Sequence, residues 1–205
     1  YSPLRFIPSI LRKNKPVHFT FFITKRCNAK CPFCFYSKEK EPGRDEMSLR
    51  EIKLLSPSLG NLLWLAFSGG EIYLREDLVD ISRVFYENNK PSIMLFPTNG
   101  LTPELIRDRT VEILKHCTDS VVVVKLSLDG LEEKHDSLRG IPGSFKKVMK
   151  TYGMLGKLLS EYPNFELGIN TVFFQVKPDG TALWPSKILP WSDLMTGKIG
   201  ENPGY

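Results

Sequence analysis

The sequence predicts an α/β protein built around a parallel sheet. Short, almost wholly apolar segments rich in β-branched and aromatic residues alternate with amphipathic segments at helical spacing. Such alternation is typical of repeated βα units, in which helices cover buried strands. In addition, unusual polar residues follow directly after the strands, as they do in (β/α) barrels, where this rim carries the active site.

Five apolar segments are expected to form the strands. In chain order they are residues 17–23, 62–67, 93–96, 120–128 and 165–173. The first alternates large apolar residues with smaller or polar ones, which indicates one buried face. The others are almost continuously apolar and short, as buried parallel strands are.

Four helices are expected between or after these strands. Ser48 and Glu51 form a capping box that begins the first helix. The second ends near Asn89, and the third begins at Pro103, a favourable first-turn residue. The fourth is expected to be capped by Ser144.

Composition excludes several classes of protein. Apolar residues make up 41% and charged residues 25% of the 205 residues, which is the balance of a globular domain and not of a disordered chain or coiled coil. No apolar run approaches the ~18 residues of a membrane span, and we expect neither a transmembrane segment nor a signal peptide. The net charge of +5 is too diffuse to predict nucleic-acid binding.

The cysteines point to metal binding. Cys27, Cys31 and Cys34 lie within eight residues, and Cys117 stands far away. This spacing favours ligands in a reducing compartment over disulfides, so we expect a cytoplasmic protein. Zinc usually takes four ligands, and no fourth lies at finger-like spacing. Three thiolates fit a [4Fe–4S] cluster with one iron left open for another ligand.

Five motifs resemble those of the radical S-adenosylmethionine (radical SAM) superfamily, over roughly residues 17–173. They are, in order, Cys27-x-x-x-Cys31-x-x-Cys34, Ser68-Gly69-Gly70-Glu71, Thr98-Asn99-Gly100, Ser127-Leu128-Asp129-Gly130 and His135-Asp136-Ser137-Leu138-Arg139-Gly140. Their succession is most similar to the branch of sulfatase-maturing and peptide-modifying (SPASM-type) enzymes and related cofactor-biosynthesis enzymes. Ile72 replaces a proline usual in the family. That change leaves the preceding carboxylate unaffected.

The resemblance implies a partial (β/α)6 TIM-like barrel that binds a [4Fe–4S] cluster and SAM. The three clustered cysteines would ligate three irons, and SAM would chelate the fourth. Glu71 would accept hydrogen bonds from the SAM amino group and Arg139 would hold its carboxylate. The other residues that the resemblance places near SAM are Phe33, Gly69, Gly70, Asn99, Ser127 and Asn170. No catalytic residue beyond these ligands is implied.

The implied activity is that of a radical SAM oxidoreductase. One electron, from a donor such as flavodoxin or ferredoxin, would cleave SAM to a 5′-deoxyadenosyl radical that abstracts hydrogen from the substrate. The resemblance favours a peptide or protein side chain as substrate. Two alternatives stay open: a cofactor-biosynthesis step on a small molecule, and a non-catalytic three-cysteine iron–sulfur module for electron transfer.

Several residues have a structural interpretation as well. Arg139 suits a surface ion pair, and His135 a structural hydrogen bond in preference to a proton shuttle. Ser127 and Asn170 suit the barrel interior as well as the site. Cys117 is expected to be a small buried residue.

The predicted organisation is a lead-in at 1–16, a radical SAM core at 17–175 and a degenerate or fragmentary extension at 176–205. The segment 176–185 resembles the opening of a cysteine-rich extension, but Ser186 stands where a cysteine is usual. A family barrel has six βα units, whereas only five strands are counted here. We therefore expect the barrel to be incomplete, through truncation or residues missing between Gln175 and Trp191.

Overall fold

The computed structural model describes residues 15–34 and 46–171. The lead-in up to residue 14 and the extension from residue 172 lie outside this range, as do the positions where missing residues were expected. None of the helices that the structure describes is long and apolar enough to cross a membrane.

The sheet is parallel and its strands follow one another in sequence order. The strands are β1 (His18–Thr24), β2 (Trp64–Gly69), β3 (Ile93–Thr98), β4 (Val121–Ser127) and β5 (Phe165–Asn170). The helical segments are α2 (Leu49–Leu59), η2 (Ile72–Leu74), α3 (Leu78–Asn89), α4 (Pro103–His116), α5 (Glu132–Arg139) and α6 (Ser144–Glu161). The α/β class and the parallel sheet are confirmed.

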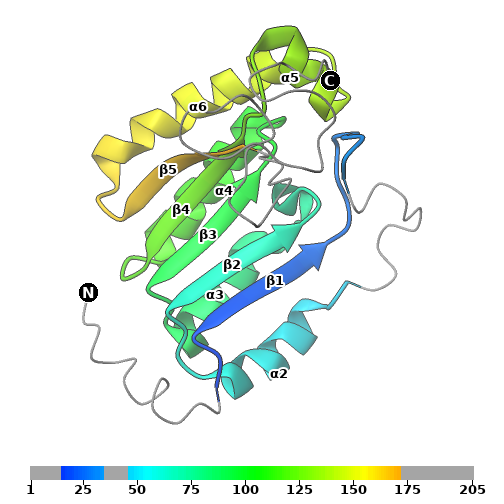
Figure 1. Cartoon of the computed structure of the whole chain (residues 1–205). Coiled ribbons are helices and arrows are strands. Elements are labelled where there is room, and N and C mark those ends of the chain that lie inside the picture. The colour runs from blue at the N-terminus through cyan, green and yellow to red at the C-terminus, as the bar shows by residue number, and fades with distance from the viewer. Residues whose placement is uncertain (1–14, 35–45, 172–205) are drawn as a thin grey trace, which may run out of the picture. The chain divides into compact units, whose positions relative to one another are not determined.

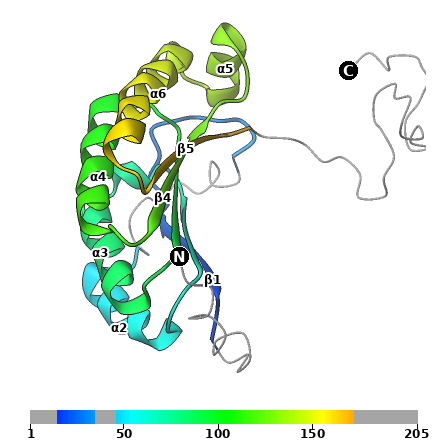
Figure 2. The ribbon, with the colours of Figure 1, turned by 90° about the vertical axis from the view of Figure 1, so that its left-hand side faces the viewer.

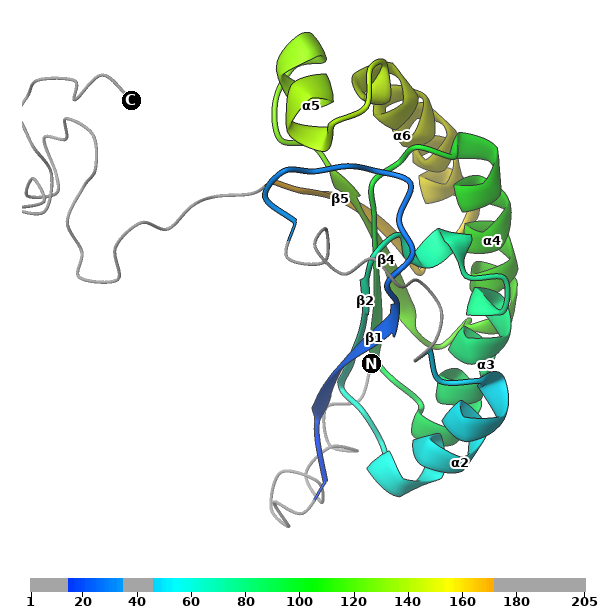
Figure 3. The same ribbon diagram turned by 90° about the vertical axis from the view of Figure 1, so that its right-hand side faces the viewer.

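The helices that connect the strands lie on one face of the sheet. Figures 2 and 3 show α2, α3, α4 and α6 stacked along this face, as in the outer layer of a barrel. The short helix α5 lies instead beyond the carboxyl ends of the strands (Figure 1). The fold therefore brings the segments that follow β1 to β4 to one end of the sheet.

The core lies between the sheet and these helices. Phe21, Phe67 and Phe96 project from three neighbouring strands and are at most 8% exposed. Phe85 of α3 contacts Phe21 and Phe67 edge to face, with ring centroids 5.8 and 6.1 Å apart. Tilted and edge-on aromatic pairs of this kind stabilise a core beyond the area they bury. This packing fixes the strand ends on which the motif residues stand.

The helix boundaries confirm two sequence signals and correct a third. Ser48 and Glu51 form the predicted capping box, and α4 begins at Pro103. Ser144 is not the cap of α6, however. Gly143 is the capping residue, and the Asp136 carboxylate accepts hydrogen bonds from the Gly143 and Phe145 amides at 2.5 and 2.7 Å. A carboxylate supplied by the preceding helix thus replaces the expected hydroxyl.

In the described residues, β5 is the last strand of the sheet, and no sixth strand follows it. β5 ends at Asn170, earlier than predicted, and the Thr171 hydroxyl donates a hydrogen bond to the Leu128 carbonyl. A small apolar cleft beside this edge is lined by Leu126, Leu128, Val148, Met149, Tyr152 and Ile169. Ile169 is 50% exposed. The described part is therefore consistent with an incomplete barrel.

Candidate functional site

The predicted motifs meet at the carboxyl end of the sheet. The cysteine segment follows β1, Gly70 and Glu71 follow β2, Asn99 follows β3, and Asp129 follows β4. Because parallel strands end at the same edge, residues far apart in sequence become neighbours there. The hydrogen bonds and ion pairs below join all four of these segments.

The two glycines after β2 pack against the start of the cysteine segment. The Gly70 amide donates to the Thr24 carbonyl and the Glu71 amide to the Arg26 carbonyl, both at 2.8 Å. A Cβ atom on Gly69 or Gly70 would lie 2.1 or 2.2 Å from a backbone oxygen of this segment. Only glycine allows this approach. These residues thus have a role in backbone packing, and their predicted proximity to SAM stays a prediction.

The three clustered cysteines are free thiols in different environments. Cys27 is exposed, Cys31 is buried, and Cys34 is intermediate. The Cys27 sulfur accepts weak hydrogen bonds from the Ala29 amide at 3.5 Å and the Asn99 side-chain amide at 3.6 Å. Although part of Cys27 is exposed, the protein atoms around its sulfur partly desolvate it and raise the pKa of the thiol, and the charge of Glu71 adds to this effect. A positive ligand on the thiolates would offset both costs.

The end of α5 is docked on the cysteine segment. The Lys30 amide donates to the Arg139 carbonyl at 2.9 Å. Gly140 ends the helix in the left-handed conformation, with φ of 64°. A Cβ atom on it would lie 2.5 Å from the Lys30 carbonyl oxygen, so this contact also requires glycine. The link fixes the loop that holds Cys31.

Glu71 is a buried carboxyl group with three hydrogen-bond donors. It is 1% exposed and accepts from the Asn99 amide at 2.7 Å, the Thr98 hydroxyl at 2.8 Å and the Tyr73 amide at 3.2 Å. Burial raises its pKa to about 7, against the lowering effect of these donors and of Arg139. Near pH 7 this group is therefore divided between carboxylic acid and carboxylate, and a cation bound beside it would favour the carboxylate.

Arg139 is the cationic counterpart of Glu71. Its guanidinium lies 2.5 Å from Asp129 in an ion pair that is 11% and 3% exposed. It also lies 3.7 Å from the Cys31 sulfur and 5.8 Å from the centre of the Phe33 ring. The Nε donor is buried and has no hydrogen-bond partner among the described residues. The prediction that Arg139 forms an ion pair at the surface is therefore wrong, because the ion pair that it forms is buried.

The rest of the α5 motif is structural. The His135 ring is fully buried, and its Nδ1 accepts a hydrogen bond from the Asp129 amide at 3.2 Å. Burial lowers the pKa of His135, and the charge of Arg139 lowers it further, so the ring is neutral near pH 7. The predicted structural hydrogen bond is confirmed. Cys117 is likewise buried, and burial raises its pKa to about 12.

Three further predicted residues lie at the same rim. The side-chain amide of Asn99 donates to Asn28 at 2.7 Å, in addition to its contact with Cys27. Ser127 and Asn170 are register partners across β4 and β5, and Asn170 is exposed. Ser127 alternates with the buried Leu126, so it faces away from the helices.

The chemistry of the cysteine thiols indicates which metal group they suit. In the two described stretches, no three His, Cys, Asp or Glu side chains are grouped closely enough to hold one metal ion. By their chemistry, three thiolates that each bind a different iron are the donor set of an iron–sulfur cluster, so these residue types fit that group. Arg139 lies 3.7 Å from the Cys31 sulfur, and Asn99 links Glu71 to Cys27, so a carboxyl group and a guanidinium adjoin the cysteine segment and would suit a zwitterionic ligand.

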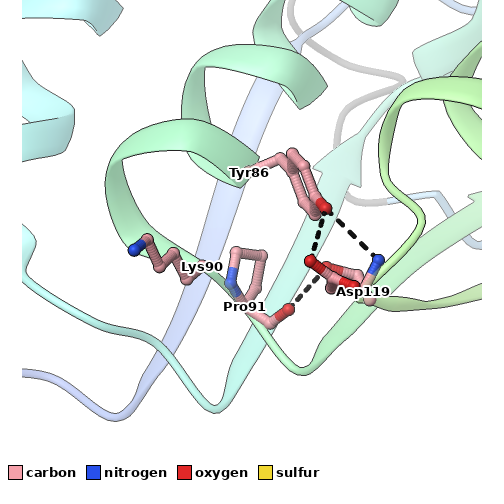
Figure 4. Close-up of a pocket in the computed structure, with 5 residues that line it drawn as sticks. Tyr86, Lys90, Pro91 and Asp119 are labelled. Atoms are coloured by element: carbon pink, nitrogen blue, oxygen red, sulfur yellow. Dashed lines mark hydrogen bonds between the residues drawn. The ribbon is translucent and has the colours of Figure 1, made fainter.

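A second cavity lies at the opposite end of the sheet. It has a volume of about 380 Å³ and is lined by Tyr86, Lys90, Pro91, Asp119 and Ser120 (Figure 4). The Tyr86 hydroxyl donates to Asp119 at 3.2 Å, and the Ser120 hydroxyl to the Pro91 carbonyl at 2.5 Å. These polar groups bind one another, and none of the predicted motifs reaches this cavity.

Two family models match the chain. The model of the radical SAM superfamily matches residues 21–173, and that of the glycosyl hydrolase-like 10 family matches residues 151–205. The two matches overlap on residues 151–173. Over 40 residues the chain is also 45% identical to the glycosyl hydrolase YngK of Bacillus subtilis, covering 20% of this chain and 8% of that protein.

The curated relatives include proteins named for bacteriocin biosynthesis and for heme synthesis. The subtilosin biosynthesis protein AlbA of Bacillus subtilis is 33% identical over 161 residues, 77% of this chain and 34% of AlbA. The AdoMet-dependent heme synthase of Nitratidesulfovibrio vulgaris is 30% identical over 139 residues, which are 65% of this chain and 35% of that synthase. This chain thus spans about a third of the length of these relatives.

Solved structures show the same fold. The structure of anSMEcpe with bound AdoMet superposes with a TM-score of 0.57 at 22% identity, over 75% of this chain and 43% of that chain. SuiB of Streptococcus suis, bound to its precursor peptide SuiA, gives a TM-score of 0.56 at 21% identity. The superposition covers 83% of this chain and 36% of the SuiB chain.

Proposed function

Because this chain belongs to the radical SAM superfamily, we propose that its core binds a [4Fe–4S] cluster through Cys27, Cys31 and Cys34 and cleaves SAM reductively. When bound, the reduced cluster would supply one electron to the sulfonium of SAM; the bond between sulfur and C5′ would break to give methionine and a 5′-deoxyadenosyl radical that abstracts hydrogen from a substrate. The core is taken as residues 17–175. SAM-bound structures of the same fold support the choice of cofactor.

The observation that carries the proposal is the pair of opposite charges beside the cysteine segment. Glu71 offers a buried carboxylate and Arg139 a buried guanidinium with an unpartnered Nε donor. The amino-acid part of SAM presents an ammonium and a carboxylate, which match these two groups. An electron-transfer module has no need of either.

The remaining site residues have proposed roles in placing SAM. Phe33, Asn99 and Asn170 are assigned to the adenine and ribose, and Ser127 adds a hydroxyl contact near the carboxylate. Asn99 has a second role in the structure, because its amide nitrogen holds Glu71 while its side chain contacts Cys27. It thus couples the SAM site to the cluster loop.

We propose a peptide or protein side chain as the substrate. The names of AlbA and of the sporulation killing factor maturation protein SkfB, 33% identical over 147 residues, support this choice. The alternative is a small molecule of cofactor biosynthesis, which the heme synthases support. The proposed electron donor is a flavodoxin or ferredoxin, and the proposed compartment is the cytoplasm.

Residues 176–205 are proposed to lie outside the radical SAM core. The radical SAM match ends at residue 173, and the glycosyl hydrolase-like match continues to residue 205. These matches favour a segment of a second family over a degenerate cysteine-rich extension.

Anaerobic reconstitution with iron and sulfide tests the proposal. We expect four irons and four sulfides per chain, and an electron paramagnetic resonance (EPR) signal of the reduced cluster that changes on addition of SAM. The triple Cys27→Ala, Cys31→Ala and Cys34→Ala variant is expected to bind no cluster, whereas Cys117→Ala serves as the matched control and is expected to bind it fully. A cluster signal that SAM leaves unchanged would favour the electron-transfer alternative.

A further inference from the structure

Asp129 lies at the centre of the link between β4 and the cysteine segment. It stands two residues beyond the end of β4, and its side chain is 3% exposed. Its carboxylate lies 2.5 Å from the guanidinium of Arg139, the last residue of α5. A carboxylate this deeply buried is retained only where it has partners.

The backbone of Asp129 is held from a second direction. Its amide donates to Nδ1 of His135, whose ring packs edge-on against Phe145 with centroids 6.2 Å apart. His135 is buried and neutral, so this acceptor is present throughout the neutral pH range. The position of the Asp129 carboxylate is thus fixed by strand β4 and by helix α5 together.

Arg139 depends on this fixed carboxylate for its orientation. Its other guanidinium contacts are weak: the Cys31 sulfur at 3.7 Å and the face of the Phe33 ring at 5.8 Å. Its Nε donor has no hydrogen-bond partner among the described residues. Arginine has many rotamers, and ordering it has an entropic cost that a fixed ion-pair partner offsets in advance.

We infer that Asp129 is a positioning residue that holds the Arg139 guanidinium between Cys31 and Phe33, ready for the carboxylate of SAM. The inference rests on the proposed function of the site. Asp129 acts through geometry: its negative charge opposes that of an incoming carboxylate, so its contribution to affinity comes from fixing the donor fork. Asparagine, which keeps one acceptor oxygen, therefore retains part of the effect, and alanine retains none.

The test is the SAM dissociation constant of cluster-loaded protein, measured by the change in the EPR signal as SAM is added. EPR detects only the molecules that hold a reduced cluster, so a partly loaded variant still gives a valid constant. We expect Asp129→Ala to raise the constant by roughly ten-fold or more and Asp129→Asn to raise it less. Asp136→Asn is the matched control.

Asp136 lies on the same helix but caps α6. Its substitution is expected to lower the thermal stability and to leave the SAM dissociation constant within about two-fold of that of the unsubstituted protein. Unsubstituted protein that binds no SAM would refute the proposed function itself. If it binds SAM and both Asp129 variants bind equally well, only the positioning role is overturned. An equal loss in Asp129→Asn and Asp129→Ala would overturn the proposed basis of the role, because the acceptor oxygen that asparagine keeps would then have no effect.

Discussion

The most informative perturbation of stability is Glu71→Gln, because it removes a buried titratable carboxyl group and keeps the shape of the side chain. Glu71 is 1% exposed, and burial raises its pKa from 4.5 to about 7. Between these pH values the folded protein binds more protons than the unfolded chain. Its free energy of unfolding therefore falls as the pH rises through this window.

The size of the effect follows from the same pKa. The two pKa values of Glu71 differ by about 2.5 units, and each unit corresponds to about 1.36 kcal/mol. Protonated Glu71 therefore contributes ~3 kcal/mol to the free energy of unfolding below pH 4.5, and this contribution is lost by about pH 7. The glutamine amide of the Glu71→Gln variant would not titrate. It would place an NH2 group against the Asn99 or Tyr73 amide, which lowers stability by an amount that is the same at every pH.

Urea denaturation of SAM-free protein from pH 5 to pH 8.5 measures how the free energy of unfolding of each protein depends on pH. The stability of the unsubstituted protein minus that of Glu71→Gln is expected to fall by ~3 kcal/mol between pH 4.5 and 7, most of it within the measured range, and to level off above pH 7.5. Other titrating groups, His135 among them, are common to both proteins and cancel. A difference that stays constant with pH, or that grows as pH rises, would refute the reasoning.

Three further outcomes follow from the structure. Gly140→Ala forces a Cβ atom to 2.5 Å from the Lys30 carbonyl oxygen at a φ of 64°, and is expected to lower stability by about 1–3 kcal/mol and to speed loss of iron to a chelator. Ser48→Ala removes the capping box of α2 and is expected to lower stability by about 1 kcal/mol in urea denaturation, with iron content unchanged. A chain ending at Thr171 retains the compact unit that contains all three clustered cysteines, so iron and sulfide analysis is expected to find the same cluster content as in the full chain.

The strands and most helices were predictable because their signals are local. Apolar runs, capping residues and Pro103 each act over a few neighbouring positions. Two errors show the limit. Strand β2 begins at Trp64, two residues later than predicted, and the Leu62 amide donates instead to the Asn89 carbonyl at the end of α3. Helix α5 was not predicted, because its eight residues are mostly charged and its contacts are tertiary.

The site residues were found through motifs, but their contacts were not. The pairing of Arg139 with Asp129 and the hydrogen bond between Asn99 and Asn28 join residues 10 and 71 positions apart, and no local pattern encodes either. Glycine is required at residue 69 by the carbonyl of Thr24, which ends a strand 45 positions earlier. Asp129 was visible as part of a motif; only the fold shows which side chain it holds.

The most direct test of the central claim is product analysis after reduction of the cluster-loaded protein with dithionite in the presence of SAM. The account predicts 5′-deoxyadenosine and methionine in equal amounts, and neither product from the triple variant of Cys27, Cys31 and Cys34. Candidate peptide and small-molecule substrates are added to the same incubation. The account would be contradicted if SAM stayed intact when it is incubated with protein that carries a full, reduced cluster.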